Sequence, residues 1–151
     1  MKTGGKSFKI YAKKFIYILL ITILFSFSTV VLHELGHFIF GYFVGCKASK
    51  IILLDINVMT TYTEMECLQN INIFLLGISG FFLVLPISLI FFFFSKSGER
   101  YLALIMVGFN FIISAHDFEV YLRLPFSQLI AIMGALLIIT GEILLIEKTI
   151  L

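Results

Sequence analysis

The fold class of this chain is decided by one apolar stretch near its N-terminus, FIYILLITILFSFSTVVLHELGHFIFGYFV (residues 15–44). Glu34 is the only Asp, Glu, Lys or Arg within it. About 20 apolar residues in an α-helix cross the hydrocarbon core of a bilayer, so the stretch is long enough to span a membrane. The apolar region of a cleavable secretory signal is shorter, about 7–15 residues, and we therefore expect this helix to remain in the mature protein.

Composition and three further apolar runs extend this interpretation to the whole chain. Of the 151 residues, 60% are hydrophobic and 13% are charged. A soluble domain has about 25% charged residues, so a soluble enzyme is excluded. The sequence predicts an all-α integral membrane protein with about four transmembrane helices, which form one membrane-embedded unit over residues 1–151. The predicted spans are residues 15–44, 68–94, 101–118 and 125–146.

Charges outside the spans indicate the orientation of the chain in the membrane. Five of the 11 basic residues precede position 15, and Lys96 and Arg100 lie in the turn between the second and third spans. Cytoplasmic segments are enriched in Lys and Arg, so we expect the N-terminus and this turn on the cytoplasmic side. The net charge of +2 gives no indication of nucleic-acid binding, and the sequence does not define an oligomeric state.

The connection between the first two spans differs from the rest of the chain. Residues 51–63 are rich in β-branched side chains and are too short and polar to span a membrane. We expect a short strand or hairpin at the membrane surface, with its edge paired or covered, because unpaired backbone groups are costly in lipid. Cys46 and Cys67 flank this segment. We expect two separate thiols, and a disulfide is the alternative if the loop faces an oxidising compartment.

Polar residues at the level of the membrane gather in two clusters. His33, Glu34 and His37 form the pattern H-E-x-x-H in the first span, and His116 and Asp117 adjoin at the end of the third. A charged side chain at the centre of a membrane helix costs at least about 2.5–3.5 kcal/mol, so such residues are functional candidates by default. Only about 0.002 matches to H-E-x-x-H are expected by chance in a chain of this length and composition, which makes coincidence a poor explanation.

The spacing of the H-E-x-x-H pattern suits a metal site with hydrolytic chemistry. Residues four apart share one face of a helix, so His33 and His37 can bind one metal ion. Glu34 is offset by about 100° from His33, beside the metal, where it would act as a general base on a water molecule. The alternatives are a structural or transport metal site and a pair of histidines satisfied by hydrogen bonds.

A catalytic zinc ion usually has three protein ligands and one open position, so a third ligand is needed. The first and third spans run parallel in a serpentine arrangement of four helices, which places their distal ends at the same depth. Asp117 is therefore the expected third ligand, and His116 is the alternative. We expect Glu119 to be a loop charge or a partner of Arg123, and Glu142 to reach towards the membrane interface.

These residues resemble those of the site-2 protease family of intramembrane zinc metalloproteases. That family places H-E-x-x-H in one membrane helix and an Asp ligand two spans later, often after a Phe-Asn pair, and here Phe109 and Asn110 precede Asp117. The resemblance covers residues 15–120 and implies a supporting role for Asn110 near the reacting carbonyl. It implies a site nearer the cytoplasmic side, whereas the N-terminal lysines indicate the outer side. It also implies that one zinc ion per chain is held by His33, His37 and Asp117.

The sequence thus predicts hydrolysis of peptide bonds within or near a transmembrane segment of a membrane protein substrate. Glu34 would take a proton from water and return it to the leaving amine, and Asn110 would donate to the developing oxyanion. A helical substrate must be unwound locally, and residues 51–63 could accept the extended stretch by strand addition, with a simple covering hairpin as the alternative. The rival class is a metal-binding membrane protein without hydrolytic activity, such as a transporter or sensor subunit.

Overall fold

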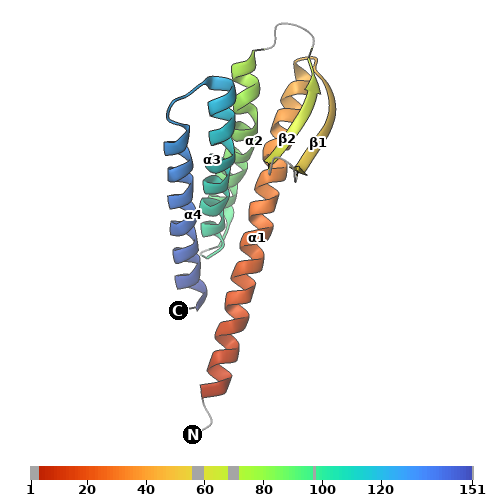
Figure 1. Cartoon of the computed structure of the whole chain (residues 1–151). Coiled ribbons are helices and arrows are strands. Elements are labelled where there is room, and N and C mark those ends of the chain that lie inside the picture. Colours follow the sequence, from red (N-terminus) through yellow and green to blue (C-terminus); the bar gives the residue numbers. More distant parts are fainter. Residues whose placement is uncertain (1–3, 56–59, 68–71, 97, 151) are drawn as a thin grey trace.

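Four helices and one β-hairpin make up the computed structural model of the chain, which describes residues 4–55, 60–67, 72–96 and 98–150 (Figure 1). All four helices are long and apolar enough to cross a membrane. The prediction of a multi-pass integral membrane protein with a hairpin after the first helix is therefore confirmed. In chain order the elements are α1 (Gly4–Phe43), β1 (Lys47–Asp55), β2 (Thr60–Glu66), α2 (Ile73–Phe94), α3 (Arg100–Leu122) and α4 (Ser127–Ile150).

The bounds of all four helices differ from those expected: α1 begins 11 residues before the predicted span 15–44, and α4 ends four residues after the predicted span 125–146. Helix α2 begins at Ile73, where the side chain of Asn72 accepts hydrogen bonds from the backbone N–H groups of Phe74 and Leu75 at 3.1 and 3.3 Å. The first residues of the predicted span, 68–71, lie outside the described residues. Helix α3 runs four residues beyond the predicted end, to Leu122. Asp117 therefore lies within a helix, where its side-chain direction is fixed by the helical repeat.

Helices α2, α3 and α4 lie side by side, and α1 crosses them at an angle, with the hairpin against its C-terminal half (Figure 1). At 40 residues, α1 is about 60 Å long, roughly twice the thickness of the hydrocarbon core. An apolar cluster joins α1, α3 and α4 away from the hairpin. Its buried members are Ile18, Leu102, Ile105 and Leu145.

Glycines let the helix backbones approach closely. A Cβ atom added to Gly36 would lie 2.7 Å from the backbone oxygen of Ser79, so α1 and α2 touch there. A Cβ added to Gly108 would lie 2.6 Å from the backbone oxygen of Gly134, which brings α3 against α4. Small residues are the usual means of close helix packing in membranes, where lipid is as apolar as the side chains. The first of these contacts sets the distance between α1 and α2 beside the histidines.

The hairpin is antiparallel, and its two ends are joined by a disulfide between Cys46 and Cys67. The expectation of two separate thiols is wrong. Strand pairing begins at Lys47 and Glu66, so the two cysteines, each one residue outside that pair, come to lie opposite one another. This register was not readable from the sequence, because residues 51–63 do not define where the ladder starts.

The disulfide agrees with the N-terminal lysines on the orientation of the chain, because disulfides persist in oxidising compartments. The hairpin lies at one end of the bundle, and the start of α1 and the end of α4 lie at the other (Figure 1). In intact cells, a cysteine replacing the exposed Lys50 in β1 should react with a membrane-impermeant maleimide. A cysteine replacing the exposed Lys96 at the opposite end should react only after permeabilisation. The reverse pattern would contradict the orientation.

Candidate metal centre

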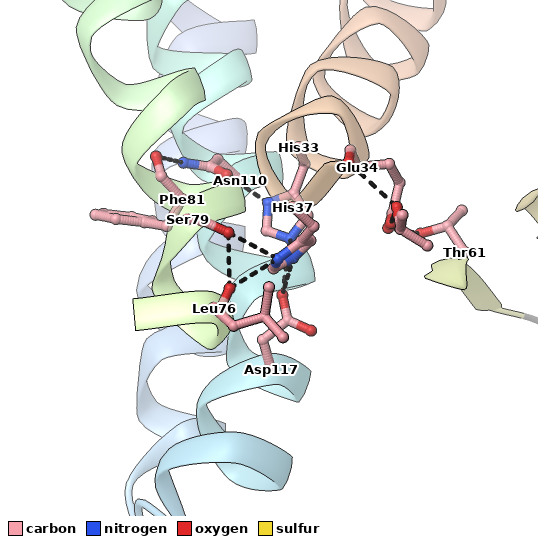
Figure 2. A network of polar contacts seen from close by, with 10 residues as sticks. His33, Glu34, His37, Thr61, Leu76, Ser79, Phe81, Asn110 and Asp117 are labelled. Atoms are coloured by element: carbon pink, nitrogen blue, oxygen red, sulfur yellow. Dashed lines mark hydrogen bonds and ion pairs between the residues drawn. The ribbon is translucent and has the colours of Figure 1, made fainter. Parts of the chain in front are cut away.

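Two histidines of α1 and one aspartate of α3 converge between the helices (Figure 2). His33 is 1% exposed and His37 is 7% exposed, while the side chain of Asp117 is 16% exposed. One ligand atom from each of the three residues lies within 4.8 Å of the other two. The helical repeat places the histidines on one face of α1, and the parallel course of α1 and α3 brings Asp117 to the same depth. The structure thus brings together the three residues that the sequence predicted as metal ligands.

The hydrogen bond of His37 fixes which of its ring nitrogens is free to bind a metal. The Nδ1 atom lies 2.9 Å from the backbone oxygen of Leu76, which can only accept, so Nδ1 carries the proton. The hydroxyl of Ser79 lies 3.0 Å from the same Nδ1 and donates to the same backbone oxygen at 2.7 Å, which leaves its own oxygen able to accept. The Nε2 atom of His37 is therefore the ring nitrogen that is available to a metal ion.

The tautomer of His33 follows from a chain of two hydrogen bonds. The side-chain amide of Asn110 donates to the backbone oxygen of Phe81 at 3.2 Å, which turns its Oδ1 towards His33. The Nδ1 atom of His33 lies 3.1 Å from that oxygen and donates to it. Partners of this kind behind a metal-binding histidine fix its orientation and tautomer. The Nε2 atom of His33 thus faces Asp117, at 2.7 Å from its Oδ2 atom.

Three possible ligand atoms face one another in a buried space. The Oδ2 atom of Asp117 lies 2.7 Å from the Nε2 atom of His33 and 3.2 Å from that of His37, and the two Nε2 atoms are 3.2 Å apart. Ligand atoms about 2.0–2.1 Å from a tetrahedral zinc ion are about 3.3 Å apart, which two of the three separations approach. Two imidazoles and a carboxylate are also a donor set typical of zinc. The residues present therefore fit a zinc ion.

Gly80 of α2 makes room for one of these imidazoles. A Cβ atom at this position would lie 2.7 Å from both Cε1 and Nε2 of His33. The Gly80→Ala variant should therefore displace the ring and weaken zinc binding by about 10–100-fold, the range seen when the support of a ligand is lost. Competition with a chelator of known affinity measures the change. The matched control is Gly98→Ala, where an added Cβ atom would lie 3.9 Å from Cβ of Lys148, an ordinary contact. Equal affinities in the two variants would contradict the prediction.

Glu34 occupies a different position from the three converging residues. It is 3% exposed, and both of its carboxylate oxygens accept hydrogen bonds from the hairpin. The hydroxyl of Thr61 donates to Oε1 at 2.9 Å, and that of Thr63 donates to Oε2 at 2.8 Å. Figure 2 shows the carboxylate directed from α1 towards Thr61, to one side of the converging histidines. The general base expected from the sequence is thus held by the hairpin.

The remaining polar residues of the third span take other positions. His116, the alternative third ligand, is exposed, because consecutive residues of a helix point about 100° apart and Asp117 faces the histidines. Glu119 accepts a hydrogen bond from the hydroxyl of Ser127 at 3.3 Å. Asn110 is fully buried behind His33, so its contacts serve to orient that ring. Its expected role as an oxyanion donor stays a prediction.

Sequence reasoning missed Thr61, Thr63 and Ser79. The two threonines carried a usable signal, since residues two apart lie on the same face of a strand and this pair lies on a segment predicted to be one. Ser79 gave none, because its contact with His37 depends on how α2 packs against α1. Thr61 and Thr63 contact Glu34 from β2, and Ser79 contacts His37 from α2. A sequence pattern within α1 does not reveal contacts that come from other elements.

No family model, curated protein or solved structure matches this chain. The resemblance to site-2 proteases therefore rests on the H-E-x-x-H pattern and on the placement of Asp117.

Proposed function

We propose that this protein is an intramembrane zinc metalloprotease that hydrolyses peptide bonds within or near the transmembrane segments of other membrane proteins. The observation that carries the proposal is the convergence of the Nε2 atoms of His33 and His37 on Oδ2 of Asp117, next to Glu34 of the same H-E-x-x-H pattern. All four residues lie in segments long and apolar enough to span a membrane. A hydrolytic site at this depth is suited to substrates that are themselves in the bilayer.

The residues divide the chemistry between them. His33, His37 and Asp117 would hold the zinc ion, which supplies Lewis-acid chemistry by activating water and polarising the scissile carbonyl. Glu34 takes a proton from the water molecule as the water oxygen bonds to the carbonyl carbon. Glu34 then gives that proton to the amide nitrogen as the C–N bond breaks, so one water is consumed and a carboxylic acid and an amine are formed. Asn110 and the backbone oxygen of Leu76 keep the two imidazoles oriented.

The hairpin offers a means of presenting an extended substrate. A transmembrane helix has its backbone amides in internal hydrogen bonds, so the scissile segment must unwind before it can be cleaved. The described sheet has two strands, β1 and β2, and each has one edge outside their common ladder. An unwound segment could add to such an edge as a further strand. The proximity of β2 to Glu34 favours this arrangement.

Reconstitution into proteoliposomes tests the proposal against its rival, metal transport without hydrolysis. A panel of single-span membrane proteins is co-reconstituted, and cleavage is followed by mass spectrometry. We expect cleavage within or near the span, its loss on treatment with 1,10-phenanthroline, and its recovery on addition of stoichiometric zinc. Zinc-dependent accumulation of metal in the vesicle lumen without any cleavage would contradict the protease proposal and support transport.

A further inference from the structure

The hairpin does more than shield the buried carboxylate of Glu34 from lipid, because it makes a separate hydrogen bond to each carboxylate oxygen. Each carboxylate oxygen has its own hydroxyl donor, Thr61 for Oε1 at 2.9 Å and Thr63 for Oε2 at 2.8 Å. The Thr63 oxygen also lies 3.2 Å from the backbone oxygen of Glu34, so it stays against α1 whichever oxygen receives its proton. Two donors, one on each oxygen, define both the position and the plane of the carboxylate. A single donor would not define the plane.

Strand geometry explains how one element supplies both donors. Thr61 and Thr63 are two residues apart in β2, so their side chains leave the same face of the strand. Thr63 pairs with Ile51 of β1, within the ladder. The spacing of the two hydroxyls is therefore set by the backbone of the sheet and does not depend on a flexible loop.

The hairpin itself is fixed to α1 near these threonines. The disulfide joins Cys46, three residues after the end of α1, to Cys67, one residue after β2. Met65 of β2 contacts Gly41 of α1, where the absence of a side chain admits its sulfur. The disulfide and this packing contact thus limit the movement of β2 relative to Glu34.

We propose that Thr61 and Thr63 are positioning residues that hold the Glu34 carboxylate in the orientation from which it acts as the general base. The inference rests on the proposed function. A glutamate has three rotatable side-chain bonds, and a general base must come within about 2.6–3.2 Å of the proton that it takes. An ionised carboxylate has about four acceptor sites, so the two hydroxyls leave others for the water. The strand that presents substrate would then also set the place of the base.

The Thr61→Val/Thr63→Val double variant tests this inference, because valine keeps the shape of threonine without its hydroxyl. We expect kcat for cleavage of a reconstituted membrane substrate to fall by about 10–100-fold, since misplacement of a catalytic group by about 1 Å has effects of this size. The KM should change less than about twofold, and the zinc content should stay at one per chain. The Thr61→Ser/Thr63→Ser variant, which retains both hydroxyls, should recover most of the lost kcat.

Two comparisons make the outcome decisive. Thr140→Val removes an exposed hydroxyl of α4 that bonds only within its own helix in the described contacts, to Leu136, and should leave kcat unchanged. Zinc content and the disulfide report that the double valine variant is folded. Full or increased activity of the double valine variant would overturn the positioning role. A double serine variant that does not recover kcat would overturn it as well.

Glu34→Gln, measured in parallel, separates this inference from the proposed function. Wild-type protein that cleaves and a Glu34→Gln variant that does not, together with a fully active double valine variant, would overturn the role of the threonines alone. Absence of cleavage by the wild type would overturn the proposed function, and equal cleavage by the wild type and Glu34→Gln would overturn the role of Glu34 in it, whatever the threonine variants do.

Discussion

Replacing Asp117 with alanine should empty the metal centre, so that purified protein falls from one zinc ion per chain to nearly none. The substitution removes the only carboxylate of the three ligand atoms, which lies 2.7 Å from Nε2 of His33 and 3.2 Å from Nε2 of His37. Loss of a partner behind a ligand weakens metal binding by about 10–100-fold, and loss of the ligand itself should weaken it further. Elemental analysis after dialysis against a weak chelator measures the difference.

His116→Ala is the matched control for this prediction. It removes a metal-binding type of side chain from the adjacent position of α3, but His116 is exposed and lies outside the group formed by His33, His37 and Asp117. Its zinc content should equal that of the wild type. Loss of zinc from the His116 variant, with zinc retained in the Asp117 variant, would show that the third ligand is assigned to the wrong residue.

Glu34→Gln should abolish cleavage while leaving zinc in place. A positioned general base typically contributes about 10²–10⁴-fold to a rate, and glutamine cannot take the proton. Glutamine has the shape of glutamate, and its amide oxygen can still accept from a threonine hydroxyl while its NH₂ group donates to the other. The hairpin contacts at Thr61 and Thr63 are thus largely preserved, and the loss is specific to the chemistry.

The expected result for Glu34→Gln is a kcat at least about 100-fold below that of the wild type, with one zinc ion per chain. Quantitative mass spectrometry of cleavage products and elemental analysis of the same preparation give both values. Undiminished cleavage would rule out Glu34 as the base. A change in metal flux across proteoliposomes, with no cleavage by either protein, would favour a transporter.

The four helices were predictable because membrane spans depend on length and apolarity, which are local properties of the sequence. Their ends were less so, since α3 continues beyond its apolar run to Leu122 and α2 begins at the cap formed by Asn72. The grouping of Asp117 with the two histidines followed from the parallel course of the first and third spans. Choosing it over the adjacent His116 depends on the rotation of α3, which the structure supplies.

What the sequence did not reveal depends on contacts between elements. The bond between Cys46 and Cys67 follows from the register of the hairpin, and the hydroxyls on Glu34 follow from how β2 lies against α1. The position of Asn110 behind His33 requires α3 to pack against α2, where Phe81 receives its amide hydrogen bond. These contacts join residues distant in the chain, so no pattern within a single segment encodes them.

The central claim, a zinc ion held by His33, His37 and Asp117, is tested most directly by X-ray absorption spectroscopy at the zinc edge on wild-type protein purified with its disulfide intact. The proposal predicts one zinc ion per chain with two imidazole nitrogens and oxygen donors at about 2.0–2.2 Å. A protein that carries no stoichiometric metal after growth and purification in zinc, or a zinc ion with sulfur ligands, would contradict it.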